Sequence, residues 1–172
     1  MQQGGSVALV FPPLWYYQSV PADLLYTGSH LRAQGIDTRC FDLNAGMFAA
    51  LWQNSAGFHA LRRRETYGDE RAANFVTSQL LNSLETIAKH HRARFDYLHL
   101  GFPDVDESHV PAALAVGLLA SRNPALPYLR AQVPQILKTS PRLIAVALGH
   151  PDQVVQILVL GKLLREAGYD GC

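Results

Sequence analysis

The chain has 172 residues, and its 15 lysines and arginines nearly balance its 14 aspartates and glutamates, which leaves a formal charge of +1 at pH 7. A chain of this length is sufficient for one domain with a well-packed core. With 48% hydrophobic and 17% charged residues, the composition excludes a disordered or highly charged chain. The near-neutral charge also gives no electrostatic basis for binding nucleic acid or an anionic membrane, so we expect any partner to recognise a local site.

Cysteine content and the lack of long apolar runs limit the chain further. Cys40 and Cys172 are its only cysteines, too few for a disulfide framework, a four-cysteine zinc site or an iron–sulfur cluster. Residues 1–6 are polar and glycine-rich and do not have the basic start and apolar core of a secretion signal. The longest apolar runs are about eight to ten residues, against the roughly 20 that a membrane helix needs. We expect a cytoplasmic protein with no membrane segment.

The amino-terminal segment predicts a strand, a helix and a second strand. Residues 7–11 form a short, continuous apolar run that stops at two prolines, which is typical of a strand buried on both faces of a parallel sheet. Apolar residues at helical spacing between 21 and 34 predict a helix, and Gly35 lies where its C-cap is expected. We therefore expect parallel strands near 6–11 and 36–42, joined in one βαβ unit.

The middle of the chain has a mostly helical pattern. Residues 45–94 contain two apolar helical segments separated by a basic connection, and we interpret them as a helical insertion in the domain. The apolar run at 96–102 predicts a fourth parallel strand. Helices are expected at 110–120 and 128–139, with Pro134 near a helix start or at a kink.

The carboxyl-terminal segment has the clearest pattern. Residues 142–148 predict another buried strand, a loop follows at 149–152, and an apolar helix extends over 153–167. The whole chain, 1–172, is thus expected to be a single α/β domain: a three-layer Rossmann-like (flavodoxin-like) parallel sheet with helices on both faces. Such a sheet needs one more strand after the last helix, and only residues 169–172 remain. We expect a sheet that is incomplete at the C-terminus, with an unpaired edge that favours self-association.

The loops after the strands are the expected functional site, because ligands of open α/β sheets bind at the carboxyl ends of the strands. The sequence has no GxGxxG after its first strand and no GxxxxGK(S/T), which excludes the two common phosphate-binding loops. Pro12 and Pro13 have no backbone N–H to donate to a phosphate. An apolar, planar ligand fits this loop better.

Titratable residues do not form a recognisable catalytic or metal-binding pattern. His90 and His91 are adjacent and therefore point to different sides of a helix, and the other histidines lack partners at metal-ligand spacing. There is no GxSxG motif and no pair of carboxylates at a defined spacing, so no catalytic or metal-ligating residue is assigned. His150, in a strand-end loop, has two interpretations: it contacts a ligand, or it packs at the start of the next helix. The apolar residues expected in the core rather than at a cofactor are Met47, Phe48, Leu51 and Trp52.

Four segments of the sequence resemble a known family. They are VFPPLW at 10–15, LRAQG at 31–35, CFDLN at 40–44 and PRLIAVALGHPDQ at 141–153. In their order and their places at strand ends, they are similar to the amino-terminal cobalamin (vitamin B12)-binding domain of cobalamin-dependent radical S-adenosylmethionine enzymes. The most similar group of that superfamily modifies ribosomally made peptides. The resemblance covers roughly residues 7–54 and 128–170.

The resemblance implies a cobalamin-binding module in which the corrin ring rests across the strand ends. The residues implied in this contact are Pro13, Leu14, Trp15, Asp42, Asn44, Gly149, His150, Pro151, Asp152 and Gln153. The implied partner is a radical S-adenosylmethionine catalytic domain, in cis or in trans, which would carry out methyl transfer or radical chemistry.

Two motifs of that superfamily are missing from the chain. The DxHxxG motif, whose histidine binds cobalt in many cobalamin proteins, is absent, as it is in many members of this group. The CxxxCxxC motif that holds the iron–sulfur cluster is also absent, so we expect no such cluster in this chain and no catalysis by the chain alone. The alternative, from a different functional class, is a flavodoxin-like protein-interaction or regulatory domain that binds no ligand. A free-standing hydrolase or reductase has no residue set to support it.

Overall fold

The structure of the chain is a computed structural model, which describes residues 6–13, 21–52, 59, 60, 63, 68–96, 99–102, 105 and 109–171. Leu14 and Trp15, two of the expected ligand-contacting residues, lie outside the described residues. The elements are, in chain order, β1 (Val7–Phe11), α1 (Ala22–Ala33), β2 (Thr38–Asp42), α2 (Leu43–Trp52), α4 (Glu70–His90), β3 (Arg94–Asp96), β4 (His99–Gly101), α5 (Val110–Gly117), α6 (Leu126–Leu137), β5 (Leu143–Val146), the short 3-10 helix η2 (Pro151–Gln153) and α7 (Val154–Glu166).

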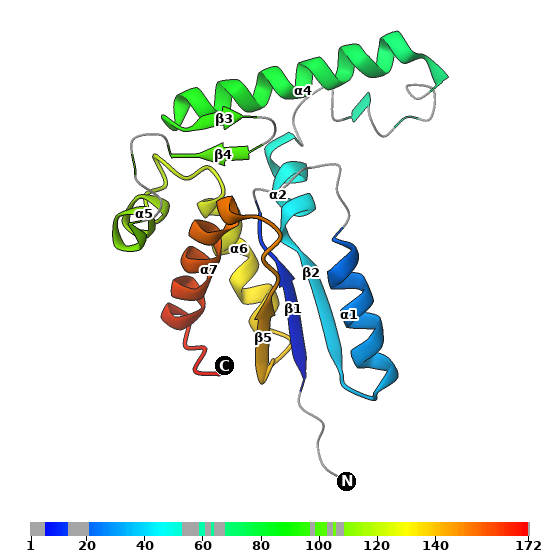
Figure 1. Cartoon of the computed structure of the whole chain (residues 1–172), viewed down its shortest axis with the longest axis vertical. Helices are drawn as coiled ribbons and strands as arrows, with labels where there is room; N and C mark the ends of the chain where they lie inside the picture. The colour runs from blue at the N-terminus through cyan, green and yellow to red at the C-terminus, as the bar shows by residue number, and fades with distance from the viewer. Residues whose placement is uncertain are drawn as a thin grey trace.

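Three parallel strands form the central sheet, in the order β2-β1-β5 (Figure 1). Their register aligns Val7 of β1 with Thr38 of β2 and with Leu143 of β5. The strands expected near 6–11, 36–42 and 142–148 are therefore confirmed, each shortened by one to three residues. The chain is a mixed α/β protein whose arrangement is compatible with a Rossmann-like fold.

β1 is buried on both faces because helices cover both sides of the sheet (Figure 1). Ala8 and Val10 belong to the hydrophobic cluster that α6 and α7 form on one face. Leu9 and Phe11, which alternate with them along the strand, pack with Leu24 of α1 on the other face. The continuous apolar run thus has the environment that its pattern predicts.

Glycines follow two of the helices, and Gly35 lies at the end of α1 as expected. Gly35, after α1, and Gly168, after α7, have φ angles of +77° and +88°, which glycine adopts without the steric cost of a Cβ. Pro134 lies inside α6, close to the end of the helix, and not near its start; the kink that was the alternative expectation stays a prediction. Pro127 occupies the first turn instead, where the missing N–H would have no intrahelical partner.

A second core lies above the carboxyl ends of the strands, between α2 and α4 (Figure 1). It contains Met47, Phe48 and Trp52, which confirms that these residues of α2 are core residues, and Val76, Leu80, Leu84 and Ala88 of α4. Tyr128 of α6 packs against both this cluster and the core of the sheet. The helices of the 45–94 segment therefore lie over the strand ends.

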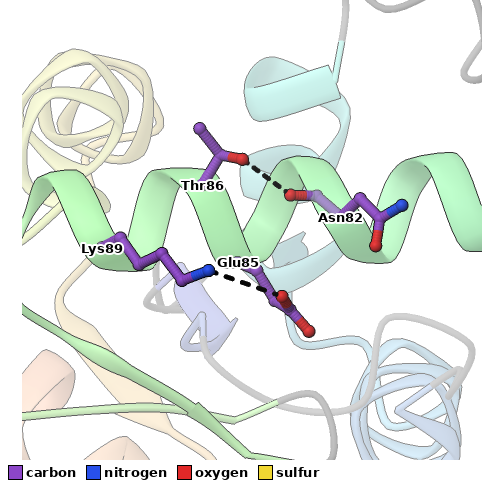
Figure 2. Close-up of polar contacts among 4 residues, drawn as sticks. All are labelled: Asn82, Glu85, Thr86 and Lys89. Carbon is purple, nitrogen blue, oxygen red and sulfur yellow. Dashed lines mark hydrogen bonds and ion pairs between the residues drawn. The ribbon is translucent and has the colours of Figure 1, made fainter.

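The outer face of α4 is solvated and mostly polar, although Phe75 is 65% exposed on this helix. Figure 2 shows Thr86 donating a hydrogen bond to the backbone oxygen of Asn82, at 2.9 Å, and an ion pair of 4.0 Å between Lys89 and Glu85. Both partners of the ion pair are exposed, so it contributes little to stability.

Among the described residues, no helix combines the length and the apolar character needed to cross a membrane.

The fourth parallel strand expected at 96–102 is wrong. Residues 99–101 form β4, which pairs antiparallel with β3 in a separate two-stranded sheet. Asp96 is opposite His99 and Arg94 is opposite Gly101, so the apolar run finds its partner in the residues immediately before it. Local pairing of this kind closes a short loop and needs no crossover.

β5 is the least buried strand of the central sheet. Among the described residues it pairs with β1 alone, and Leu143, at its amino end, is 41% exposed. An unpaired strand edge presents free backbone groups to other chains. Self-association through this edge stays a prediction.

Candidate functional site

The carboxyl ends of three parallel strands meet at one edge of the sheet (Figure 1). Pro12 and Pro13 follow β1, Asp42 ends β2, and residues 147–149 follow β5. Because β1 connects through α1 to β2 on one side, while β5 pairs with β1 on its other side, the topological switch point lies between β1 and β5. Ligands of open α/β sheets bind at such switch points.

Gln153 joins the two loops at the switch point. Its side chain is fully buried, and its Nε2 donates a hydrogen bond of 2.8 Å to the carbonyl oxygen of Pro12. Its Oε1 accepts from the backbone N–H groups of Gly149, at 2.8 Å, and His150, at 3.1 Å. This amide therefore ties the end of β1 to the loop after β5, and its hydrogen-bonding groups face protein atoms.

The loop after β5 exposes three apolar residues and partly exposes a histidine. Leu148 is 56% exposed, Gly149 and Pro151 are exposed, and His150 is half-buried. A Cβ atom at Gly149 would lie 3.3 Å from Oε1 of Gln153 and 3.4 Å from the ring of Phe11. The loop thus presents an apolar surface with little side-chain bulk at the switch point.

Asp42 and Asn44 organise the neighbouring strand end. One carboxylate oxygen of Asp42 accepts hydrogen bonds from the backbone N–H groups of Asn44, at 3.0 Å, and Ala45, at 2.9 Å. Asp42 is therefore the N-cap of α2. Asn44 is 1% exposed, so its side chain lies inside the protein.

Tyr128 and Gly46 form a close contact beside this cap that the sequence analysis missed. A Cβ atom at Gly46 would overlap the hydroxyl of Tyr128 and lie 2.9 Å from its Cζ atom. Burial, and next the Asp42 carboxylate, raise the pKa of Tyr128, so its hydroxyl remains protonated near neutral pH. A glycine inside an apolar helical pattern was the available signal, since such a glycine often marks a close approach.

We expect Gly46→Ala to lower the free energy of unfolding by about 1–3 kcal/mol, because the added methyl group overpacks the contact with Tyr128. Urea unfolding of the single and double variants with Tyr128→Leu should show a coupling of about 1 kcal/mol between the two positions. Gly161→Ala is the matched control: this helical glycine has open space around its Cβ position, so alanine should stabilise α7 by roughly 0.5–1 kcal/mol. Equal effects of Gly46→Ala and Gly161→Ala on the free energy of unfolding would contradict the close contact between Gly46 and Tyr128.

Five of the ten expected site residues surround the switch point in the described structure, namely Pro13, Gly149, His150, Pro151 and Gln153. The backbone of Asp152 lies with them in η2, and its side chain is outside the description. Asp42 and Asn44 lie one strand away, at the end of β2. No group of three or more metal-ligating side chains occurs among the described residues.

Comparison of the chain with models of known families, with curated proteins and with solved structures gives no match. The functional proposal therefore rests on the geometry of the site and on the resemblance of the strand-end sequences.

Proposed function

We propose that this chain is the cobalamin-binding module of a radical S-adenosylmethionine type enzyme, with the corrin ring held at the carboxyl ends of a Rossmann-like (flavodoxin-like) sheet. The observation that carries the proposal is the pair of loops that Gln153 holds together at the β1/β5 switch point. The choice of cobalamin comes from the resemblance of the strand-end sequences.

The apolar surface of the β5 loop fits a large planar ring. Leu148, Gly149 and Pro151 are the exposed residues of that loop, and we assign them the contact with the corrin. Gln153 and Asp42 act as positioning residues, because their hydrogen bonds to backbone groups fix the two loops. The bound cofactor would supply methyl-transfer or radical chemistry to a separate catalytic domain, while the residues of this chain bind and orient it.

The second candidate is a protein-interaction or regulatory domain of the same architecture that binds no ligand. The hydrogen bonds of Gln153 favour this second candidate, because both ends of its amide already have protein partners. Asp42 is similarly engaged as a helix cap. The two candidates differ in one measurable property, the affinity for cobalamin.

Titration of the chain with hydroxocobalamin, followed by calorimetry and by the visible spectrum of the cofactor, tests the proposal. Leu148→Glu should weaken binding by roughly tenfold or more, because it replaces an apolar contact of about 1.5–3 kcal/mol with a charge. Leu143→Glu is the matched control. It changes an exposed leucine at the opposite end of β5 and should leave the affinity unchanged.

Saturable binding that Leu148→Glu weakens and Leu143→Glu does not would support the cobalamin module. Absence of binding by the unmodified chain would overturn the proposal and favour the ligand-free interaction domain. Equal losses in both variants would also overturn it, because the ring would not rest on the carboxyl ends of the strands.

A further inference from the structure

The C-terminal end of α4 turns sharply and meets the segment that precedes α6. Arg92 has a φ angle of +49°, and its N–H donates to the carbonyl of Lys89 at 3.1 Å. The N–H of Ala93 donates to the carbonyl of Ala88 at 2.8 Å. These two bonds form a Schellman motif, which places His91 at the joint between α4 and residues 118–125.

Arg122 holds the other side of this joint. Its Nε donates to the carbonyl oxygen of His91 at 3.2 Å, and its Nη2 donates to that of Arg92 at 3.4 Å. The next residue, Asn123, is fully buried and donates to Gly117 at the end of α5 and to Gln156 of α7. The joint therefore connects α4, and with it the second core, to the helices that cover the sheet.

The surroundings of the His91 ring at this joint disfavour its protonated form. Its Nδ1 is buried and has no hydrogen-bond partner. A neutral imidazole tolerates a bare lone pair there, whereas an imidazolium would bury an N–H donor without an acceptor. The backbone of Ser121 and Ala120 acts in the opposite direction, because it raises the pKa of His91 and so favours the charged ring.

The charged and titratable neighbours of His91 also disfavour its protonated form. The ring of His90 lies edge-on at a centroid distance of 5.1 Å. The guanidinium of Arg122 binds the backbone of the same turn, and Arg92 follows directly. On α4 itself, Lys89 is paired with Glu85 (Figure 2). Apart from that exposed Glu85, these neighbours are cations or become cations in acid.

We propose that His91 is a pH-sensitive latch: its neutral ring holds the end of α4 on the 118–125 segment, and protonation releases this joint. Release exposes the C-terminal turns of α4 and loosens the second core, which lies above the carboxyl ends of the strands. The latch would thus make access to that edge depend on pH.

The direction of the pH dependence follows from the pKa of His91. Burial first, and then the neighbouring His90, lower this pKa, while the carbonyl groups of Ser121 and Ala120 oppose the shift. Because the released state has the higher pKa, it binds more protons than the closed state. The latch is therefore fully stable above the ordinary pKa of histidine, and stability is lost as the pH falls through that value toward the lower folded pKa.

Amide hydrogen exchange of the full chain, at about pH 7.5 and about pH 5.5 with intrinsic rates corrected, tests the latch. Peptides from residues 80–96 should lose protection by up to roughly tenfold at the lower pH, since a histidine with an ordinary pKa is about ten-elevenths protonated there. Peptides from α1 should not change. His91→Gln should remove most of this pH dependence, and His30→Gln, which changes an exposed histidine of α1, should keep it.

A titration of the histidine ring protons by NMR in the unmodified chain provides a test that needs no variant. A pKa for His91 below that of His30 supports the latch. A pKa at or above that of His30, protection in 80–96 that does not depend on pH, or an unchanged pH dependence in His91→Gln would overturn it.

Discussion

Replacing Gln153 with alanine is expected to lower the free energy of unfolding by roughly 2–4 kcal/mol, because three buried or half-buried backbone groups lose their partner. The carbonyl of Pro12 and the N–H groups of Gly149 and His150 would each be left without this amide. Urea unfolding near neutral pH measures the loss.

Gln153→Glu should be destabilising as well, because its carboxylate can accept from the two N–H groups but repels the carbonyl of Pro12. Gln135→Ala is the control, since Gln135 is exposed on α6, and it should stay within about 0.5 kcal/mol of the unmodified chain. If Gln153→Ala also changes the free energy of unfolding by no more than about 0.5 kcal/mol, the hydrogen bonds of Gln153 are not what fixes the two loops.

Asn123→Ala is expected to cost more, roughly 3–5 kcal/mol, because this fully buried side chain serves three elements at once. Its Oδ1 accepts from the N–H of Ala125 at 3.0 Å, next to the start of α6. Its Nδ2 donates to the carbonyl of Gly117 at 2.8 Å and to Oε1 of Gln156 at 3.0 Å. Thermal and urea unfolding of the variant measure the loss.

Asn82→Ala provides the comparison, because the Asn82 side chain is exposed on α4 (Figure 2). This change should be neutral or slightly stabilising, since alanine has the higher helix propensity. A loss at Asn123 no larger than the change at Asn82 would show that the buried amide pair does not hold α5, α6 and α7 together.

The central strands could be predicted because hydrophobicity and chain breakers act locally. The run from Val7 to Phe11 is apolar at every position and ends at two prolines. The run at 96–102 is also rich in apolar residues, but its residues 99–101 pair with Arg94–Asp96. Its choice of partner depends on which residues can reach it, and an apolar pattern does not encode that choice.

The location of the candidate site was inferred from a general property of parallel sheets, whereas the contacts of its residues could not be. Gln153 binds the carbonyl of Pro12, which is 141 positions away in the chain, so no local pattern reveals that its amide is already engaged. The contact between Gly46 and Tyr128 is hidden for the same reason. Asp42 carries a local signal, because an aspartate just before an apolar helix is a common N-cap, but the role expected for it was contact with the ligand.

Hydrogen exchange with and without saturating hydroxocobalamin locates the ligand on the chain. We expect slower exchange in peptides that contain residues 8–13 and 145–153, on the two sides of the β1/β5 switch point, and no change in the C-terminal half of α1. Slower exchange confined to other segments, or no change anywhere at saturating concentrations, would contradict this expectation.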